Sequence, residues 1–280
     1  MIQFGGITLN FWIFFLLYIF VPTLIFMLVF RPKEFCLSRI EIIYLAFLLL
    51  CYGLVGARIL HVILYYERSG GAGLDQIWKL SYSGFSSPGA IVFGLLTLHL
   101  YSRLMKKSSL EVNDYFTLFF LITVFFMRTI LCVTIAGCCY GCPVVLPWAM
   151  TFPVDDLTRH PTQVYEIIYT LALFITALRY YSRLSRIRGA TFFSIYFGYF
   201  FLRFFNEFLR VDSPPILGVL RLSNVAMIAG MALCGTGIYI AIFKKGKKQE
   251  FLILLPMMVQ MFLLSLVVIG FIILGLLTIF

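Results

Sequence analysis

Charged residues are scarce in this sequence of 280 residues: Asp, Glu, Lys and Arg together make up only 12% of it. A soluble domain has about 25%. Hydrophobic residues make up 62%, and the mean hydropathy is +1.00. This balance excludes a soluble globular protein. Acidic residues are the scarcest charges, 12 against 22 Lys and Arg, which leaves a net charge of +10.

Nucleic-acid motifs and nucleotide-binding loops are also absent from the sequence, so the positive charge does not indicate a nucleic-acid partner. The basic residues lie mostly in short gaps between apolar runs. In a membrane protein, such residues orient the chain and meet anionic lipid headgroups. We therefore expect membrane lipids, and no nucleic acid, as partners.

The cysteines do not follow the spacing of a disulfide framework or of a metal site. The total is seven, and an odd number excludes a complete disulfide framework. Four cysteines are grouped, at Cys132, Cys138, Cys139 and Cys142. This group lacks the paired Cys-x-x-Cys halves of a strong zinc site. We expect no metal and no cofactor, and interpret these cysteines as packing residues or as an outer-face disulfide.

Apolar runs close to the length of about 20 residues that spans a bilayer recur along the whole chain. The first run is longer than the apolar region of a signal peptide and follows no basic residue, so we expect a retained helix. The sequence predicts an all-α polytopic membrane protein with about eight transmembrane helices. The predicted spans are residues 7–30, 40–65, 87–102, 113–135, 162–181, 190–210, 220–243 and 251–280.

The gaps between spans alternate in charge. The first, third, fifth and seventh gaps are rich in Lys and Arg, whereas basic and acidic residues roughly balance in the others. Basic loops stay on the cytoplasmic side. Both termini and the even-numbered gaps are therefore predicted to lie outside.

Several ionisable residues lie inside the predicted spans, near their outer ends. Each such charge costs about 2.5 to 3.5 kcal/mol in hydrocarbon, so it normally faces a protein interior or a wet cavity. One interpretation is structural ion pairing between helices. The other is a site for a phospholipid phosphate, because arginines outnumber carboxylates. These residues are Arg58, Arg128, Glu166, Arg203 and Glu207.

Two further patterns indicate where polar groups gather. Residues four apart share a helix face, so Arg203 and Glu207 form a polar stripe that Tyr199, Asn206 and Arg210 extend. The run Gly84-Phe85-Ser86-Ser87-Pro88-Gly89 precedes the third span, and it is either an ordinary turn or a point of close backbone approach.

Several motifs resemble those of the bacterial prolipoprotein diacylglyceryl transferase family. His160-Pro161-Thr162-Gln163-Val164-Tyr165-Glu166 is similar to its HP[ST]Q-x-YE motif, and residues 198–210 are similar to its G-Y-x-x-x-R-x-x-x-E-F-x-R helix. Gly56-Ala57-Arg58-Ile59 resembles its G-x-R-I element, and Gly137-Cys138-Cys139-Tyr140-Gly141 resembles its signature loop. Leu222-Ser223-Asn224 is similar to a segment before its last helix. The resemblance implies a seven-helix domain over residues 1–245, with residues 246–280 as an additional C-terminal transmembrane helix.

The resemblance also implies an activity: transfer of a diacylglyceryl group from phosphatidylglycerol to the lipobox cysteine of a prolipoprotein signal peptide, in the bacterial cytoplasmic (inner) membrane. It implies catalytic roles for Arg203, Glu207, His160 and Glu166, with His160 or Glu166 as the expected base. The implied substrate-binding residues are Arg128, Arg58, Arg210, Gln163, Tyr165, Tyr199, Gly137 and Gly141.

The sequence departs from the family pattern at several places, among them the spacing of nine residues, rather than seven, from Arg128 to Gly137, and Leu131 where the family has Asn or Cys. Pro88 stands where the family has a histidine, and Trp12 stands where it has a tyrosine. A proline cannot act as a base. Two alternatives therefore remain: a family member altered to bind a lipid or partner, or to use another acceptor, and a transporter with a polar site at the midplane.

Overall fold

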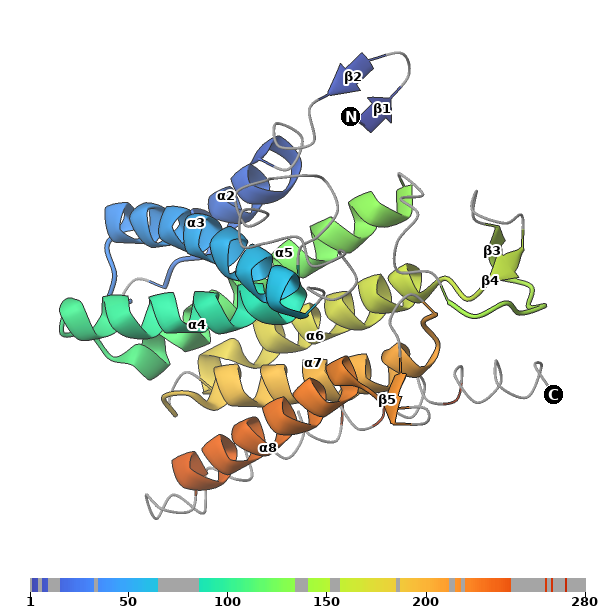
Figure 1. Cartoon of the computed structure of the whole chain (residues 1–280). Coiled ribbons are helices and arrows are strands. Elements are labelled where there is room, and N and C mark those ends of the chain that lie inside the picture. The colour runs from blue at the N-terminus through green and yellow to red at the C-terminus, as the bar shows by residue number, and fades with distance from the viewer. Residues whose placement is uncertain are drawn as a thin grey trace. The chain divides into compact units, whose positions relative to one another are not determined.

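The computed structural model is mostly helical, as expected (Figure 1). It describes residues 2–4, 7–9, 16–32, 35–64, 86–133, 141–151, 157–184, 187–211, 215–217 and 220–242, and the single residues 260, 263 and 270. Seven α-helices lie within these ranges. The chain divides into two compact units, residues 1–113 and 114–280.

The first unit is built around two long helices, α3 (Arg39–Leu64) and α4 (Ser87–Leu104), which pack against each other. A short π-helix, η1 (Leu16–Phe20), continues into α2 (Val21–Val29), and α2 contacts α3. Helices α3 and α4 agree with the predicted spans 40–65 and 87–102 to within the usual uncertainty of helix ends.

Two glycines allow α3 and α4 to approach closely. A Cβ atom on Gly89 would strike the carbonyl oxygen of Gly56, and one on Gly56 would strike the ring of Phe93. The backbone N–H of Ser86 donates to the carbonyl of Ala57 at 3.0 Å. The small residues at the start of the third span therefore make a close helix crossing, which was one of the two interpretations of that segment.

The first predicted span, residues 7–30, is wrong at its N-terminal end. Strands β1 (Ile2–Phe4) and β2 (Ile7–Leu9) form an antiparallel hairpin in which Phe4 pairs with Ile7. Helical structure is described only from Leu16 onward. The sequence has Gly-Gly at positions 5 and 6, a pair that favours a two-residue hairpin connection over a helix.

The second unit contains most of α5 (Ser109–Val133), together with α6 (Thr162–Leu184), α7 (Ala190–Phe208) and α8 (Leu222–Ile242). Helix α7 packs against both α6 and α8. Two short antiparallel hairpins lie between helices: β3 (Met150–Thr151) with β4 (Thr158–Arg159), and β5 (Pro215–Leu217) with β6 (Leu220–Arg221). The described parts of the spans predicted here are helical, except residues 209–210, which follow the end of α7, and residues 220–221, which belong to β6.

Asp114 of α5 holds the start of α7. Its Oδ2 accepts the backbone N–H of Gly189 at 2.6 Å, and its Oδ1 accepts that of Phe192 at 2.7 Å. Gly189, which precedes α7, has a φ of 87°, in the left-handed region that favours glycine. Glycine has no side chain with which to cap the helix, so a carboxylate from another helix satisfies the first amides and faces the positive end of the helix dipole.

Large apolar side chains are exposed along the long helices, for example Ile40 of α3 (79% exposed) and Leu233 of α8 (74%). Such surfaces are typical of contact with lipid or a partner rather than with water. Three described segments are long and apolar enough to cross a membrane: Arg39–Ile63, Ser109–Ile130 and Ser223–Ala241. These findings support a membrane protein. The eighth predicted span, residues 251–280, lies outside the described residues except for positions 260, 263 and 270.

Candidate active site

One face of α7 is polar and buried. Tyr199, Arg203, Asn206 and Glu207 follow one another at helical spacing, and each is no more than 4% exposed. Arg210 lies just past the end of the helix, with 12% of its side chain exposed. The polar stripe predicted from the sequence is confirmed. It faces protein, as expected for charges placed within apolar helices.

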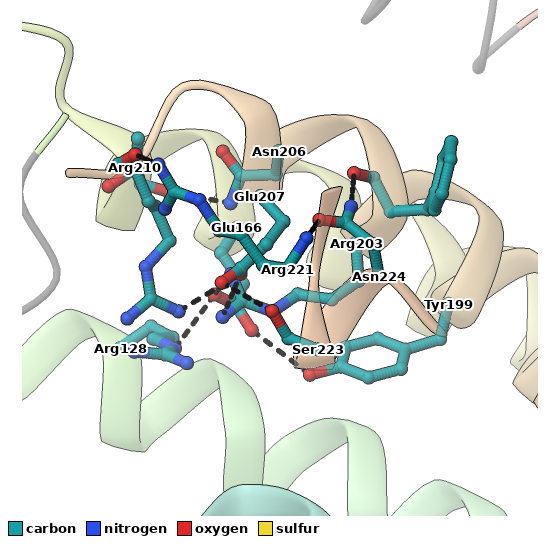
Figure 2. Close-up of polar contacts among 12 residues, drawn as sticks. Arg128, Glu166, Tyr199, Arg203, Asn206, Glu207, Arg210, Arg221, Ser223 and Asn224 are labelled. Atoms are coloured by element: carbon teal, nitrogen blue, oxygen red, sulfur yellow. Dashed lines mark hydrogen bonds and ion pairs between the residues drawn. The ribbon is translucent and has the colours of Figure 1, made fainter. Parts of the chain in front are cut away.

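Glu166, in the second turn of α6, reaches this face of α7 (Figure 2). Its Oε2 lies 2.9 Å from Nε of Arg128 and 3.2 Å from Nη1 of Arg203. Its Oε1 accepts a hydrogen bond from the Tyr199 hydroxyl at 3.0 Å. The carboxylate is therefore held by three side chains from two other helices, α5 and α7.

Glu207 is held in the same way. Its Oε2 lies 3.0 Å from Nη2 of Arg203 and 3.2 Å from Nη1 of Arg210, and its Oε1 accepts the Ser223 hydroxyl at 2.8 Å. Each of the two carboxylates thus binds two guanidinium groups through one oxygen and a hydroxyl through the other. Arg203 is shared between them. We call Arg128, Glu166, Arg203, Glu207 and Arg210 the arginine–carboxylate cluster.

Arg128 joins this cluster from α5, with 11% of its side chain exposed. The resemblance implies that Arg128 and Arg203 meet at the lipid phosphate, which stays a prediction. Both lie against Oε2 of Glu166, so the structure brings these two arginines together. Ring packing holds the neighbouring Tyr199: Phe120 of α5 meets it edge-on, with ring centres 5.0 Å apart.

The start of α8 supplies polar groups that the sequence analysis did not place in the site. Ser223 bonds to Glu207, as described above, and the side-chain N–H of Asn224 donates to the carbonyl of Phe204 at 3.3 Å. The guanidinium of Arg221 donates to the carbonyl of Arg210 (Figure 2). The Leu222-Ser223-Asn224 motif was the available signal for Ser223 and Asn224. Arg221 is not among the residues that the sequence analysis singles out.

A loop from Gly141 to Pro161 lies against the end of α7 and is described at residues 141–151 and 157–161. Gly141 pairs with Arg210 in an isolated β-bridge, and the N–H of Cys142 donates to the carbonyl of Leu209 at 2.7 Å. The backbone N–H of Gly141 donates to the carbonyl of His160 at 3.1 Å. The backbone N–H of His160 in turn donates to the carbonyl of Cys142, also at 3.1 Å. A Cβ on Gly141 would strike His160, so only glycine fits there without displacement. These bonds tie His160 to the chain segment that carries Arg210.

The side chain of His160 is completely buried, at 0% exposed. Its Nδ1 lies 3.1 Å from the hydroxyl of Tyr165, and that hydroxyl accepts a hydrogen bond from Nε1 of Trp148 at 2.9 Å. Burial lowers the pKa of His160 from its ordinary value, because a charged imidazolium is poorly solvated there. His160 is therefore neutral at physiological pH.

The remaining residues of the predicted site are placed less completely. Gln163 is buried in the first turn of α6, at 1% exposed. Arg58 is buried in α3, but it belongs to the other unit, so its convergence with the cluster stays a prediction. Gly137 lies outside the described residues.

The arginine–carboxylate cluster has a formal charge of +1, from three guanidinium groups and two carboxylates. Arginine offers planar, two-pronged donation that matches phosphate oxygens. A buried excess of positive charge favours an anion among the helices. Fold and site together are therefore those of a helical membrane protein with a net positive cluster of side chains buried among its helices.

Comparison with known proteins agrees with this class. A model of the prolipoprotein diacylglyceryl transferase family matches residues 1–243. The chain therefore belongs to the prolipoprotein diacylglyceryl transferase family, as the sequence motifs indicated.

Curated relatives carry the name phosphatidylglycerol–prolipoprotein diacylglyceryl transferase. The protein of Nitratidesulfovibrio vulgaris is 32% identical over 209 residues, which cover 71% of this chain and 75% of the relative. That of Aromatoleum aromaticum is 34% identical over 184 residues, covering 62% and 68%. That of Clostridioides difficile is 27% identical over 222 residues, covering 78% and 85%.

Proposed function

We propose that this protein is a transferase that moves the diacylglyceryl group of phosphatidylglycerol to the thiol of a lipobox cysteine in a prolipoprotein. The observation that carries the proposal is the buried arginine–carboxylate cluster in a chain of this family. The phosphodiester of phosphatidylglycerol bears one negative charge, which matches the formal charge of +1 in the cluster.

The reaction exchanges a carbon–oxygen bond for a carbon–sulfur bond. The thiolate sulfur attacks the glyceryl carbon next to the phosphate, and the bond from that carbon to the phosphate oxygen breaks. The electron pair leaves with glycerol phosphate, and the thiol proton is released to the phosphate or to water. The leaving group gains negative charge in the transition state, so fixed cationic donors accelerate the step. Arg128, Arg203 and Arg210 supply these donors.

The two carboxylates have a positioning role in this proposal. Glu166 is bonded to Arg128, Arg203 and Tyr199, and Glu207 is bonded to Arg203, Arg210 and Ser223. A carboxylate with all these donors keeps the guanidinium groups in place before the lipid arrives and is a poor acceptor for a thiol proton. Positioning donors in advance avoids reorganisation during the reaction.

The headgroup of phosphatidylglycerol carries hydroxyl groups as well as a phosphate. Three buried polar atoms in this region have no hydrogen-bond partner among the described residues: Oδ1 of Asn206, the hydroxyl of Tyr169, whose ring packs against Tyr199, and Nε2 of His160, whose backbone bonds to the loop that pairs with Arg210. Such atoms need an explanation, and a polar ligand is one. We propose that the headgroup lies near them, with Gln163, Tyr165 and Gly141 on the substrate side.

The proposed topology follows the positive-inside bias. Eight spans place both termini and the cluster toward the outer face of the bacterial inner membrane. Residues 1–245 form the transferase domain in this proposal, and residues 246–280 add a C-terminal transmembrane helix. Phosphatidylglycerol enters laterally from the outer leaflet, and the lipobox cysteine arrives from the secreted side.

The test is a transfer assay with the purified full chain in phosphatidylglycerol vesicles labelled in the diacylglyceryl group. The acceptor is a lipobox peptide, and the matched control is the same peptide with serine in place of cysteine. We expect the label on the cysteine peptide alone, with one glycerol phosphate released for each thioether formed. Binding of the labelled lipid without any thioether product would favour the altered, non-catalytic family member. Movement of an unmodified solute across the vesicle membrane would favour the transporter.

A further inference from the structure

His160 has one ring nitrogen with a partner and one without. Nδ1 lies 3.1 Å from the Tyr165 hydroxyl, whereas Nε2 is buried and has no hydrogen-bond partner among the described residues. A buried polar nitrogen left in this state costs free energy that a bound ligand can recover. What the nitrogen offers a ligand depends on where the single proton of the neutral imidazole lies.

The neighbours of His160 favour one of the two tautomers. The indole N–H of Trp148 can only donate, and it donates to the Tyr165 oxygen at 2.9 Å. A phenol oxygen has one O–H and two acceptor lone pairs. Accepting from Nδ1 as well as from Trp148 would leave that O–H without a partner among the described residues, so we assign it as the donor to Nδ1 of His160. Nδ1 then acts as an acceptor and carries no proton. In a neutral imidazole, the proton must be on Nε2.

We propose that Trp148 and Tyr165 are positioning residues that hold neutral His160 with its proton on Nε2, and that this N–H donates to an oxygen of the glycerol phosphate headgroup. The choice of headgroup rests on the proposed function. A nitrogen that carries a proton cannot accept one, and Nδ1 is occupied by the Tyr165 hydroxyl. His160 is therefore a donor to the lipid and not the base that deprotonates the thiol.

Two further observations support this assignment. The backbone of His160 bonds to Gly141 and Cys142, and Gly141 pairs with Arg210 of the arginine–carboxylate cluster, so the imidazole is attached to the segment that meets the phosphate. Burial also lowers the pKa of His160, which keeps the ring neutral and leaves Nδ1 able to accept from Tyr165.

The tautomer can be measured without any assay of activity. The chain has three histidines, so the full-length protein labelled with ¹⁵N-histidine in nanodiscs has three sets of ring signals. The set lost in His160→Gln belongs to His160. We expect a protonated Nε2 and an unprotonated Nδ1 in the wild type, and a mixture of both tautomers in Tyr165→Phe. A protonated Nδ1 in the wild type, or an unchanged tautomer in Tyr165→Phe, would overturn the proposal.

The donation to lipid has its own test. Adding phosphatidylglycerol to nanodiscs of phosphatidylcholine should shift the Nε2 signal of His160 and leave those of His61 and His99 in place. An unmoved Nε2 signal would refute donation to the headgroup even if the tautomer is as expected. An inactive wild type that still shows this shift would refute the proposed transfer reaction and not the His160 assignment.

Two substitutions separate a donor from a base in the transfer assay. The side-chain amide N–H₂ of glutamine reaches about as far as Nε2 of histidine, and that of asparagine about as far as Nδ1. His160→Gln should therefore keep activity within about tenfold of the wild type, whereas His160→Asn should lose at least tenfold more. Equal inactivity of the two variants, both folded, would contradict the donor role.

Discussion

The two ends of α7 hold buried carboxylates in different ways. At its start, Asp114 accepts the backbone amides of Gly189 and Phe192. At its other end, Glu166 and Glu207 accept three arginine side chains. Backbone amides carry only partial charge, so Asp114 caps the helix and offers nothing further to a ligand. At the other end three arginines meet two carboxylates, so of these two carboxylate sites it is the one with a net positive charge to offer an anion.

Arg203→Lys should have the largest effect on activity, because lysine keeps the charge but cannot donate to Glu166, Glu207 and a phosphate through a planar fork. We expect a loss of at least about 100-fold in the transfer rate, the size seen when a preorganised donor is removed. The measurement is the rate per folded molecule, with folding checked by gel filtration and thermal melting. Arg103→Lys, an exposed position in α4, is the matched control and should leave the rate unchanged. Equal rates for the two variants would remove Arg203 from the proposed mechanism.

Glu166→Gln should have the next largest effect. The amide keeps the shape of the side chain but loses the charge that attracts Arg128 and Arg203, so we expect a loss of about tenfold to 100-fold in kcat. A hydrogen bond to a charged group contributes about 1.5–3 kcal/mol, and about 1.4 kcal/mol corresponds to tenfold in rate.

Glu41→Gln is the matched carboxylate control for this prediction. Glu41, in the first turn of α3, accepts the N–H of Ser38 at 2.7 Å, and it lies in the first unit. Its substitution should lower thermal stability slightly and leave kcat at the wild-type value. A Glu166→Gln variant as active as Glu41→Gln would mean that the ion pairs only hold helices together.

Acidification should have a moderate effect through His160. Its pKa is lowered in the folded protein because the ring is buried. The unfolded chain therefore takes up a proton first as the pH falls below about 6.5, and folding stability is lost from there down to the folded pKa. Burial raises the pKa of the neighbouring Cys142 thiol, so that group does not titrate in this range. Thermal melts at successive pH values should show this loss in the wild type, and a smaller one in His160→Gln. Parallel curves for the two proteins would contradict it.

Asp114→Ala should have the smallest effect on activity. Loss of a helix cap costs about 0.5–2 kcal/mol of stability, and the two amides at the start of α7, those of Gly189 and Phe192, lose their partner. We expect a lower melting temperature. The transfer rate per folded molecule should be unchanged when it is measured roughly 20 degrees below the melting temperature of the variant, where the variant stays folded. A loss of activity as large as that of Glu166→Gln would show that the start of α7 also controls the position of the cluster.

Most of the helices were predictable because an apolar run of about 20 residues has few other stable forms in a membrane. The exception is instructive. Residues 7–9 form a strand although they are as apolar as the run that follows, because hydropathy reports composition and the hairpin depends on pairing with residues 2–4. The small residues 84–89 were ambiguous for the same reason: whether a glycine makes a turn or a crossing depends on what lies opposite.

Within the site, the polar stripe of α7 was predictable because helical spacing relates residues only a few positions apart. The partners of the stripe were harder to predict. Glu166 and Arg203 are 37 positions apart, and Ser223 and Glu207 are 16 apart, so no local rule relates them. Arg221 was missed altogether, since a loop arginine resembles any other topology-setting charge until its partner, the carbonyl of Arg210, is known.

Composition and local spacing were enough to predict a helical membrane protein with buried arginines, because the cost of placing charges and open backbone in hydrocarbon leaves few arrangements. The motifs were enough to indicate the family. Only the folded structure decides that two carboxylates share Arg203, and that Trp148 and Tyr165 leave the proton of His160 on Nε2. Hydrogen bonds act over about 3 Å and depend on direction, so they exist only once residues distant in the chain have been brought into contact.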